Sequence, residues 1–406
     1  MKRFFIALGL LSLALGLSAQ NVTKEKPENC GMSSEKLEQI DGFVEQAIAD
    51  KNIPGAVIAV QREDKIVYLK AFGNKQIVPT VEPMTTNTIF DLASLSKCVG
   101  TTMSFMQLIE NGQVRLSDDV DRYFPDFKPW TDPETGEKVD ITIQDLMTHS
   151  SGLDAYINVG KYVEKYGENT PDQLMTYIST EVGRSFRPGT DFRYSCLNFI
   201  TLQNILEQVT GQKLCDYAME NVFKPLKMKH TSYFPLDREV DKKFLKQCAP
   251  TEVQKDGKPL IAQVHDPLAR LVNWGNSGNA GVFSTAEDLA ILASVIMNDG
   301  KYGGNKSLLG KRTLEAMMRI PASNDPEIGR ALGWDKHSSH TGFFGDIFDK
   351  EYTIGHTGYT GTSMLIDMKS KVAIIVLTNR VHPEDGGAVG RLRAQISNIV
   401  AGSILD

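Results

Sequence analysis

Ser94 and Lys97 lie three residues apart in the segment FDLASLSKCVGTTMSFMQLIENG, which spans residues 90–112. In a helix this spacing puts both side chains on one face, where the serine could act as a nucleophile and the lysine amine could remove its proton. Apolar residues around the pair, such as Leu92 and Met103, indicate that the helix is buried. Because burial of an unpaired ammonium is costly, we expect Lys97 to have a polar partner.

Three other serines match nucleophile motifs less well. Ser33 and Lys36 repeat the same spacing, but a helix-capping serine and a solvated lysine explain them. Ser363, in GTSML, resembles the nucleophile motif of subtilisin-like proteases but lies where we expect a β-hairpin. Ser277, in WGNSGNAG, resembles a chymotrypsin-like motif, but the long helical patterns of this chain do not suit an all-β double barrel. Ser94 is therefore the candidate nucleophile.

Two later motifs could complete a site around Ser94. Tyr194, in FRYSCLNF, precedes an expected helix, and a tyrosine beside the serine and lysine could relay a proton. His356, in IGHTGYTG, lies on an expected strand and is followed by Thr357 and Gly358. Taken alone, each has an ordinary structural interpretation, as a buried tyrosine and a strand histidine, and only their order along the chain favours a functional one.

Ser-x-x-Lys, then Tyr-Ser-x, then a basic residue with Thr-Gly, in this order, resembles the serine β-lactamase and penicillin-binding-protein superfamily. The most similar branch comprises class C β-lactamases with the related D,D-peptidases and esterases. Seven segments spread over nearly the whole mature chain resemble that family: IPGAVIAV, FDLASLSK, TIQDLMTHSSGL, FRYS, ILEQVTG, FSTAEDL and IGHTGYTG.

The resemblance implies a hydrolase that forms an acyl-enzyme on Ser94, with Lys97 and Tyr194 as general base and acid, and with His356 as a fourth catalytic position. Backbone N–H groups of Ser94 and Tyr359 would form the oxyanion hole. It implies substrate-binding contacts from Tyr359, Thr357, Gly358, Cys196 and Asn198. No metal or organic cofactor is implied, and the substrate would be a small molecule or a peptide.

Two departures from the family pattern concern substrate recognition. Class C β-lactamases carry Asn where this chain has Cys196, and the nearest amide is that of Asn198. Their Lys-Thr-Gly is replaced by a motif beginning with His356, which is largely neutral near pH 7 and holds a carboxylate less firmly. Both changes favour an esterase-like or amidase-like hydrolase. A D,D-carboxypeptidase or D-amino-acid peptidase on cell-wall peptides stays open, as does a non-catalytic protein that binds muropeptides or peptides.

The surrounding elements predict an α/β (α+β) fold of the β-lactamase/transpeptidase type. A helix with Leu37, Ile40, Phe43 and Ala47 on one face precedes a hairpin made of AVIAVQ and KIVYLKAFG. Strands return in EYTIGHTG, TSMLIDM and KVAIIVLTN, before a last helix at about 386–404. An antiparallel sheet from both chain ends is therefore expected as one lobe, at about 35–93 and 301–406. A helical lobe at about 94–300 completes a single catalytic domain over residues 20–406, and its helix near 286 should begin with a capping box of Ser284 and Glu287.

Residues 1–19 have the layout of a secretory signal peptide, so we expect a periplasmic or secreted protein without a lipid anchor or a stable membrane anchor. The 44 basic and 50 acidic residues give a net charge of −6 with no basic run, which argues against nucleic acid as a partner. The seven histidines lack metal-ligand spacing. Among them, His149 is expected to be structural, His265 is a candidate for the cleft wall, and His337 and His340 are expected on a mobile surface loop. Oligomeric state and the pairing of the five cysteines stay open.

Overall fold

The computed structural model of the chain describes residues 22–304 and 306–405. The predicted signal peptide, residues 1–19, lies outside them. Helix α1 (Ser34–Ala49) begins at a capping serine, because Ser33 Oγ accepts a hydrogen bond from the backbone N–H of Lys36 at 3.3 Å. The capping interpretation of Ser33 is thus confirmed. Val44 rather than Phe43 completes the buried stripe, since Phe43 lies at the edge of that face and is 39% exposed.

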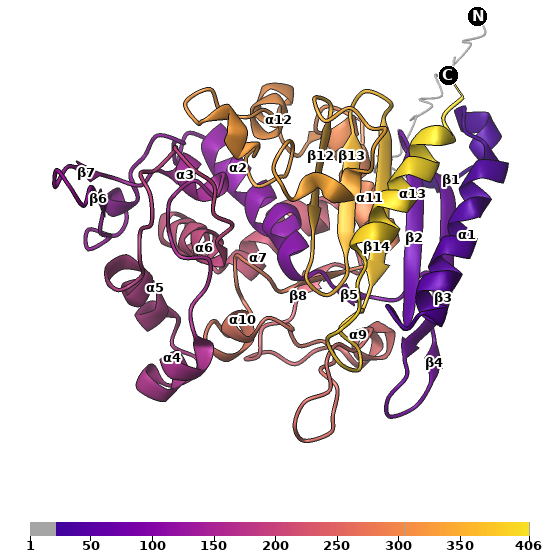
Figure 1. The fold of residues 1–406 in the computed structure, drawn as a ribbon, viewed down its shortest axis with the longest axis horizontal. Helices are drawn as coiled ribbons and strands as arrows, with labels where there is room; N and C mark the ends of the chain where they lie inside the picture. Colours follow the sequence, from indigo (N-terminus) through magenta and orange to yellow (C-terminus); the bar gives the residue numbers. More distant parts are fainter. Residues whose placement is uncertain (1–21, 305, 406) are drawn as a thin grey trace, which may run out of the picture.

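A seven-stranded sheet joins the two ends of the chain, as predicted (Figure 1). Its main strand order is β1-β3-β2-β14-β13-β12, with β4 paired to β3, and every pair except β1 with β3 is antiparallel. The hairpin predicted near the N-terminus pairs with the last strand, β14, so strands from the early and the late part of the chain meet in the middle of the sheet. The strands are β1 (Thr23–Lys24), β2 (Gly55–Arg62), β3 (Lys65–Gln76), β4 (Glu82–Pro83), β12 (Thr353–Thr357), β13 (Ser363–Asp367) and β14 (Val372–Thr378).

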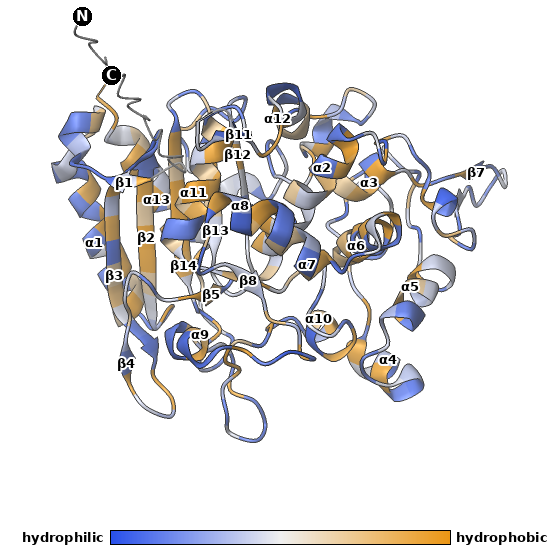
Figure 2. Cartoon of the chain, turned by 180° about the vertical axis from the view of Figure 1, so that it is seen from behind, coloured by the Kyte–Doolittle hydropathy of each residue, from blue (hydrophilic) through white to orange (hydrophobic). Residues whose placement is uncertain are grey.

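Both faces of the sheet are buried, and the alternation of side chains in β2 shows how. Val57 and Ala59 point into the large core shared with the helical lobe, whereas Ile58 and Val60 point into a second core under α1 and α13 (Gly390–Gly402). Figure 2 shows these apolar strands beside α1, whose outer surface is more polar. Helix α11 (Ala286–Met297) covers the first face and contacts β2 and β14.

The predicted start of α11 was wrong by one residue. Its N-cap is Thr285, whose Oγ1 accepts from the N–H of Asp288 at 3.3 Å, and not Ser284. Ser284 is the last residue of strand β9 (Val282–Ser284), and its hydroxyl contacts that of Thr231 at 2.7 Å. The strand pairing leaves Ser284 extended and moves the cap to the next residue.

The helical lobe lies beside the sheet and contributes the rest of the large core. Its helices are α2 (Met103–Glu110), α3 (Ile143–Met147), α4 (Val159–Tyr166), α5 (Pro171–Thr180), α6 (Cys196–Thr210), α7 (Leu214–Ala218), α8 (Lys224–Leu226), α9 (Lys242–Gln247) and α10 (Pro267–Leu271). Helix α12 (Lys311–Met318) follows α11. Short strands are β5 (Phe90–Asp91), β6 (Trp130–Thr131), β7 (Lys138–Val139), β8 (Ser232–Tyr233), β10 (Lys301–Tyr302) and β11 (Lys306–Ser307). Among the residues described, no helix is both long and apolar enough to span a bilayer.

Candidate active site

The turn that presents Ser94 is held in a strained conformation. Ala93 has a φ of +46°, a left-handed conformation that costs a non-glycine residue about 1–3 kcal/mol. The buried carboxylate of Asp91 compensates by accepting hydrogen bonds from the N–H groups of Ala93 at 2.8 Å and of His265 at 2.6 Å. A 3₁₀ turn over Ala93–Leu95 and a π-helical turn over Lys97–Thr102 then lead into α2. The predicted helical segment therefore opens with irregular turns, which are common at functional sites.

Lys97 and Ser94 are brought together as their spacing predicts. The Nζ of Lys97 lies 3.1 Å from Ser94 Oγ, and the lysine side chain is fully buried. Its second strong partner is the backbone carbonyl of Asn279 at 2.9 Å. Within the described part of the chain, Lys97 forms no ion pair with a carboxylate. The amine thus has the polar partners that burial requires, but no fixed negative charge.

The protonation of Lys97 depends on two neighbours. Burial, the largest influence, lowers the pKa of Lys97, whereas negative charge on Cys196 and Tyr194 would raise it above its ordinary value. Burial also raises the pKa of the Cys196 thiol and of the Tyr194 phenol, so both are neutral near pH 7. With both neighbours neutral, burial is the dominant influence and lowers the pKa of Lys97, opposed by the negative charge of Asp266. The Lys97 amine is therefore suited to accept a proton from Ser94.

Tyr194 lies against this pair, directly before α6. Its ring centroid is 5.0 Å from Lys97 Nζ, and its buried hydroxyl makes no hydrogen bond of standard geometry with any described residue. Ser94 and Lys97 are nevertheless close enough to counteract part of the rise that burial causes in the pKa of Tyr194. His149 packs on its other side with ring centroids 4.3 Å apart, and is buried as expected of a structural histidine.

His356 faces the site from β12 as a neutral side chain. Its Nδ1 donates to the carbonyl of Thr357 at 2.7 Å, and its buried Nε2 has no partner among the described residues. Burial, together with the nearby Arg330 guanidinium, lowers the pKa of His356 to about 3. Arg330 is itself buried and paired with Asp335. Burial beside the Arg330 guanidinium is consistent with the prediction that residue 356 carries no permanent charge.

The loop after His356 is fastened to the segment that carries Ser94. The hydroxyls of Thr360 and Thr362 donate to the carbonyls of Asp91 at 2.7 Å and Leu92 at 2.9 Å. Gly358 fits here only because it lacks a side chain, since a Cβ would lie 2.2 Å from the Leu92 oxygen.

Two backbone N–H groups next to this junction are free. Those of Ser94 and Tyr359 donate to no other described residue, and both residues line the same cavity. Such a pair of donors can stabilise an oxyanion that forms on a substrate attacked by Ser94.

A cavity of about 280 Å³ joins these groups. Its lining consists of Ser94, Tyr194, Asp335, His340, His356, Thr357, Gly358, Tyr359, Arg380 and Arg393. The two arginines were missed from the sequence. Arg393 comes from α13 and donates to the carbonyls of Thr362 and Gly358 at 2.7 and 3.2 Å, while Arg380 lies 4.6 Å from the centroid of the Tyr359 ring. No sequence motif marked them, because neither is near the other site residues in the chain.

Cys196 and Asn198 were both predicted to contact the substrate, but only the first lies next to Lys97. Cys196 lies at the site, with Sγ 3.6 Å from Lys97 Nζ. Asn198 is fully buried two residues further along α6, where its amide contacts Ser151 Oγ at 2.6 Å and His149 Nδ1 at 3.3 Å. Its side chain is committed to the interior of the helical lobe. Neither Asn198 nor Cys196 is among the residues that line the cavity.

Two histidines outside the predicted set also lie near the cavity. His340 was expected on a surface loop, and it is an exposed residue in a turn, as expected. Its ring nevertheless packs 5.8 Å from Tyr194 and lines the cavity, and the next residues, Thr341–Phe344, form a largely buried 3₁₀ helix. His265 stacks on Tyr359 at 5.8 Å, so it supports the cavity wall from behind. Across the described ranges, no group of three or more His, Cys, Asp or Glu residues could hold a metal ion. All five cysteines are free.

Comparisons with known proteins agree with this geometry. The Beta-lactamase family matches residues 40–398. N-acetylmuramyl-L-alanine amidase of Bacillus subtilis is 32% identical over 94% of this chain and 91% of its own length. An Escherichia coli protein named "Putative D-alanyl-D-alanine carboxypeptidase" is 31% identical over 94% of this chain and 92% of its own.

Solved structures share the fold. EstCE1, a hydrolase with promiscuous acyltransferase activity, has a TM-score of 0.70 at 24% identity and covers 91% of this chain and 99% of its own. A penicillin-binding-protein homologue from Caulobacter crescentus has a TM-score of 0.68 at 16% identity, with 92% and 99% covered. The chain therefore belongs to the β-lactamase family, as its ordered motifs predicted, and is a serine hydrolase with the fold of β-lactamases and penicillin-binding proteins.

Proposed function

We propose that the protein is an exported serine hydrolase that cleaves amide bonds in cell-wall peptides through an acyl-enzyme on Ser94. The observation that carries the proposal is the buried Lys97 amine, 3.1 Å from the Ser94 hydroxyl and without a carboxylate partner among the described residues. A solvated lysine would be protonated near pH 7, whereas this one is placed where the neutral amine is favoured. Surface Ser-x-x-Lys pairs, such as Ser33 and Lys36, lack that environment.

Acylation follows from these positions. Lys97 takes the proton of Ser94 as Oγ attacks the substrate carbonyl, and the N–H groups of Ser94 and Tyr359 stabilise the resulting oxyanion. Tyr194, next to both side chains, gives a proton to the departing amine nitrogen and regains one from Lys97. Water then attacks the ester on Ser94 by the reverse sequence of proton transfers. Loss of one oxyanion donor typically costs about 10²–10³ in rate.

The cations of the cavity favour a substrate that carries a carboxylate. From the sequence, His356 in place of the family's lysine predicted weak binding of a substrate carboxylate. Arg393 and Arg380 line the cavity beside Ser94 and bring positive charge from another part of the chain, and Arg380 is also paired with Asp385 at 2.7 Å. The stem peptides of peptidoglycan end in a carboxylate. The names of the Bacillus and Escherichia relatives point to cell-wall peptides in the same way.

Ester hydrolysis is the second candidate function, and Cys196 favours it. A substrate amide is best held by a side-chain amide next to the nucleophile. Here that place has a thiol, and Asn198 is engaged with Ser151 and His149. A site without this amide discriminates less between an ester and an amide.

The test compares mature wild-type protein with Ser94→Ala on p-nitrophenyl butyrate and on purified muropeptides. We expect the wild type to release amine products from muropeptides, and Ser94→Ala to lose nearly all activity on both substrates. Mass spectrometry of the quenched wild type should show an acyl adduct on the peptide that contains Ser94. Ester turnover alone would favour the esterase function, and muropeptide binding without turnover would favour a binding protein. Equal activity of the two proteins would exclude Ser94 as the nucleophile.

A further inference from the structure

A loop over residues 273–279 lies between α6 and the helical turns that carry Lys97. Gly278 is pressed so closely against α6 that a Cβ would lie 2.0 Å from the carbonyl oxygen of Phe199. On its other side, the Gly278 carbonyl accepts a hydrogen bond from Thr101 Oγ1 at 2.7 Å. Thr101 is four residues after Lys97. The loop therefore touches both elements that build the site, but contributes no residue to the lining of the cavity.

Gln203, on α6, holds this loop with all the hydrogen bonds that its amide can make. Its Nε2 donates to the Asn276 carbonyl at 2.8 Å and to Glu207 at 3.0 Å. Its Oε1 accepts from Asn273 Nδ2 at 2.8 Å and from the Gly278 N–H at 2.9 Å. The side chain is only 2% exposed, so no water is needed to complete this set.

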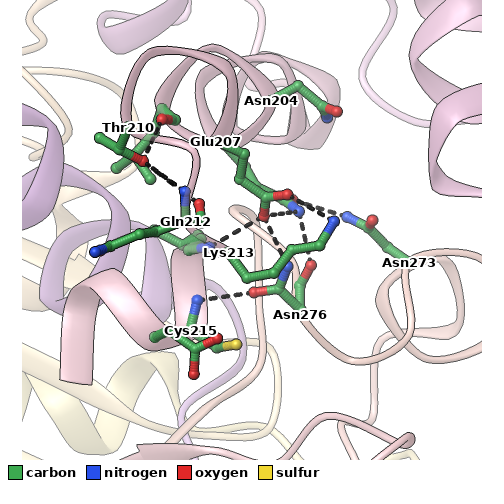
Figure 3. A network of polar contacts seen from close by, with 12 residues as sticks. Asn204, Glu207, Thr210, Gln212, Lys213, Cys215, Asn273 and Asn276 are labelled. Carbon is green, nitrogen blue, oxygen red and sulfur yellow. Dashed lines mark hydrogen bonds and ion pairs between the residues drawn. The ribbon is translucent and has the colours of Figure 1, made fainter. Parts of the chain in front are cut away.

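The outer end of the same network is anchored by Glu207 (Figure 3). Its carboxylate accepts from Asn276 Nδ2 at 2.8 Å, from Lys213 Nζ at 3.0 Å and from the N–H of Leu214 at 3.0 Å. Asn276 in turn accepts from the N–H of Cys215 at 2.9 Å. The loop is thus tied to the end of α6 and the start of α7 before it reaches the site.

The inner end of the network reaches Lys97. Ser277 Oγ accepts from Asn273 at 2.9 Å and donates to Asn279 Oδ1 at 2.6 Å. The backbone carbonyl of Asn279 then accepts from Lys97 Nζ at 2.9 Å. We infer that Gln203 is a positioning residue for the hydrolysis: by fixing Gly278 and Asn276, it sets the Asn279 carbonyl that orients the Lys97 amine toward Ser94. The inference rests on the proposed function of Ser94 and Lys97.

The pH dependence of the reaction separates this role from simple stabilisation of the fold. A carbonyl that accepts from Lys97 favours its ammonium form. A displaced Asn279 carbonyl therefore lowers the pH at which Lys97 becomes a free base, and leaves the amine poorly aimed. The other titratable groups that act on Lys97 or are influenced by it are unchanged by the substitution: Tyr194, Cys196, Asp266, Cys98, His149 and His356.

The experiment measures kcat and KM for p-nitrophenyl butyrate from about pH 5 to 9 in wild type, Gln203→Met, Ser277→Ala and Asn204→Ala. For Gln203→Met we expect kcat to fall about 10–100-fold with little change in KM. The acid limb of kcat/KM should move down by about one pH unit. Ser277→Ala should shift the limb in the same direction by less. Asn204 is the control and should leave the profile unchanged, because its side chain donates to the carbonyl of Ile200 in its own helix and to no other residue that the structure describes.

Thermal unfolding of each variant shows whether the variant folds, and therefore which variant tests the inference. If Gln203→Met folds and keeps the wild-type pH profile, the positioning role is overturned, even if the variant is less stable. If Gln203→Met does not fold, the Ser277→Ala variant provides the test. A pH profile of Ser277→Ala that matches that of the wild type then overturns the inference. A wild type that neither hydrolyses the ester nor reacts at Ser94 with a fluorophosphonate overturns the proposed function itself, and this inference with it.

Discussion

His356 should make the folded protein less stable as the pH falls below about 6.5, and a His356→Gln variant should lose that dependence. Burial and the Arg330 guanidinium lower the pKa of His356 to about 3 in the folded protein. In the unfolded chain a histidine titrates near about 6.5. Between these values the unfolded state binds a proton that the folded state does not, so stability rises with pH in this window. One pH unit is worth about 1.4 kcal/mol, or about 2.7 kcal/mol between pH 6.5 and 4.5.

Urea unfolding of both proteins at about pH 7.5, 5.5 and 4.5 measures this effect as a difference between two free energies of unfolding. The lost contact between His356 Nδ1 and the Thr357 carbonyl adds the same offset at every pH. His149, whose pKa burial also lowers well below its ordinary value, is present in both proteins and cancels. The variant should become more stable relative to wild type as the pH falls. A difference that stays constant within about 1 kcal/mol from pH 7.5 to 4.5 would refute a neutral, buried His356.

Three further substitutions test the site. Lys97→Met should lower kcat/KM for p-nitrophenyl butyrate by about 10²–10⁴. It should not lower the midpoint of thermal unfolding, because methionine fills the space of a buried amine that forms no ion pair with a carboxylate among the described residues. A large loss of stability would show that the amine is a structural ion. Arg380→Met should raise the KM for muropeptides with a free carboxylate about tenfold and should leave the KM for the neutral ester unchanged. Equal effects on both substrates would contradict a contact between Arg380 and the substrate carboxylate. Cys196→Asn should raise the ratio of amide to ester hydrolysis, measured as kcat/KM on matched substrates, and an unchanged ratio would show that this position does not contact the acyl group.

Much of the fold could be predicted because its elements have local signals. The hairpin after α1 and the three late strands follow from β-rich runs between turns, and they lie where they were expected. The errors are also local. Phe43 and Val44 are adjacent apolar residues, so periodicity alone could not say which one faces the sheet. Ser284 and Thr285 are adjacent capping residues, and only the pairing of β9 decided between them.

The order of short motifs predicted Ser94, Lys97, Tyr194 and the turn after His356 as one site, and the structure brings them together. The prediction was possible because chemistry of this kind needs particular side chains at particular spacings. What the sequence could not determine is which distant residues share the cavity. Arg380 and Arg393 reach it through the sheet and α13, and Asn279 contacts Lys97 across 182 residues of chain. Asn198 shows the converse, since it is two residues from Cys196 but bonds away from the site. Such contacts depend on how helices and strands pack, and packing is a property of the whole chain rather than of any one segment.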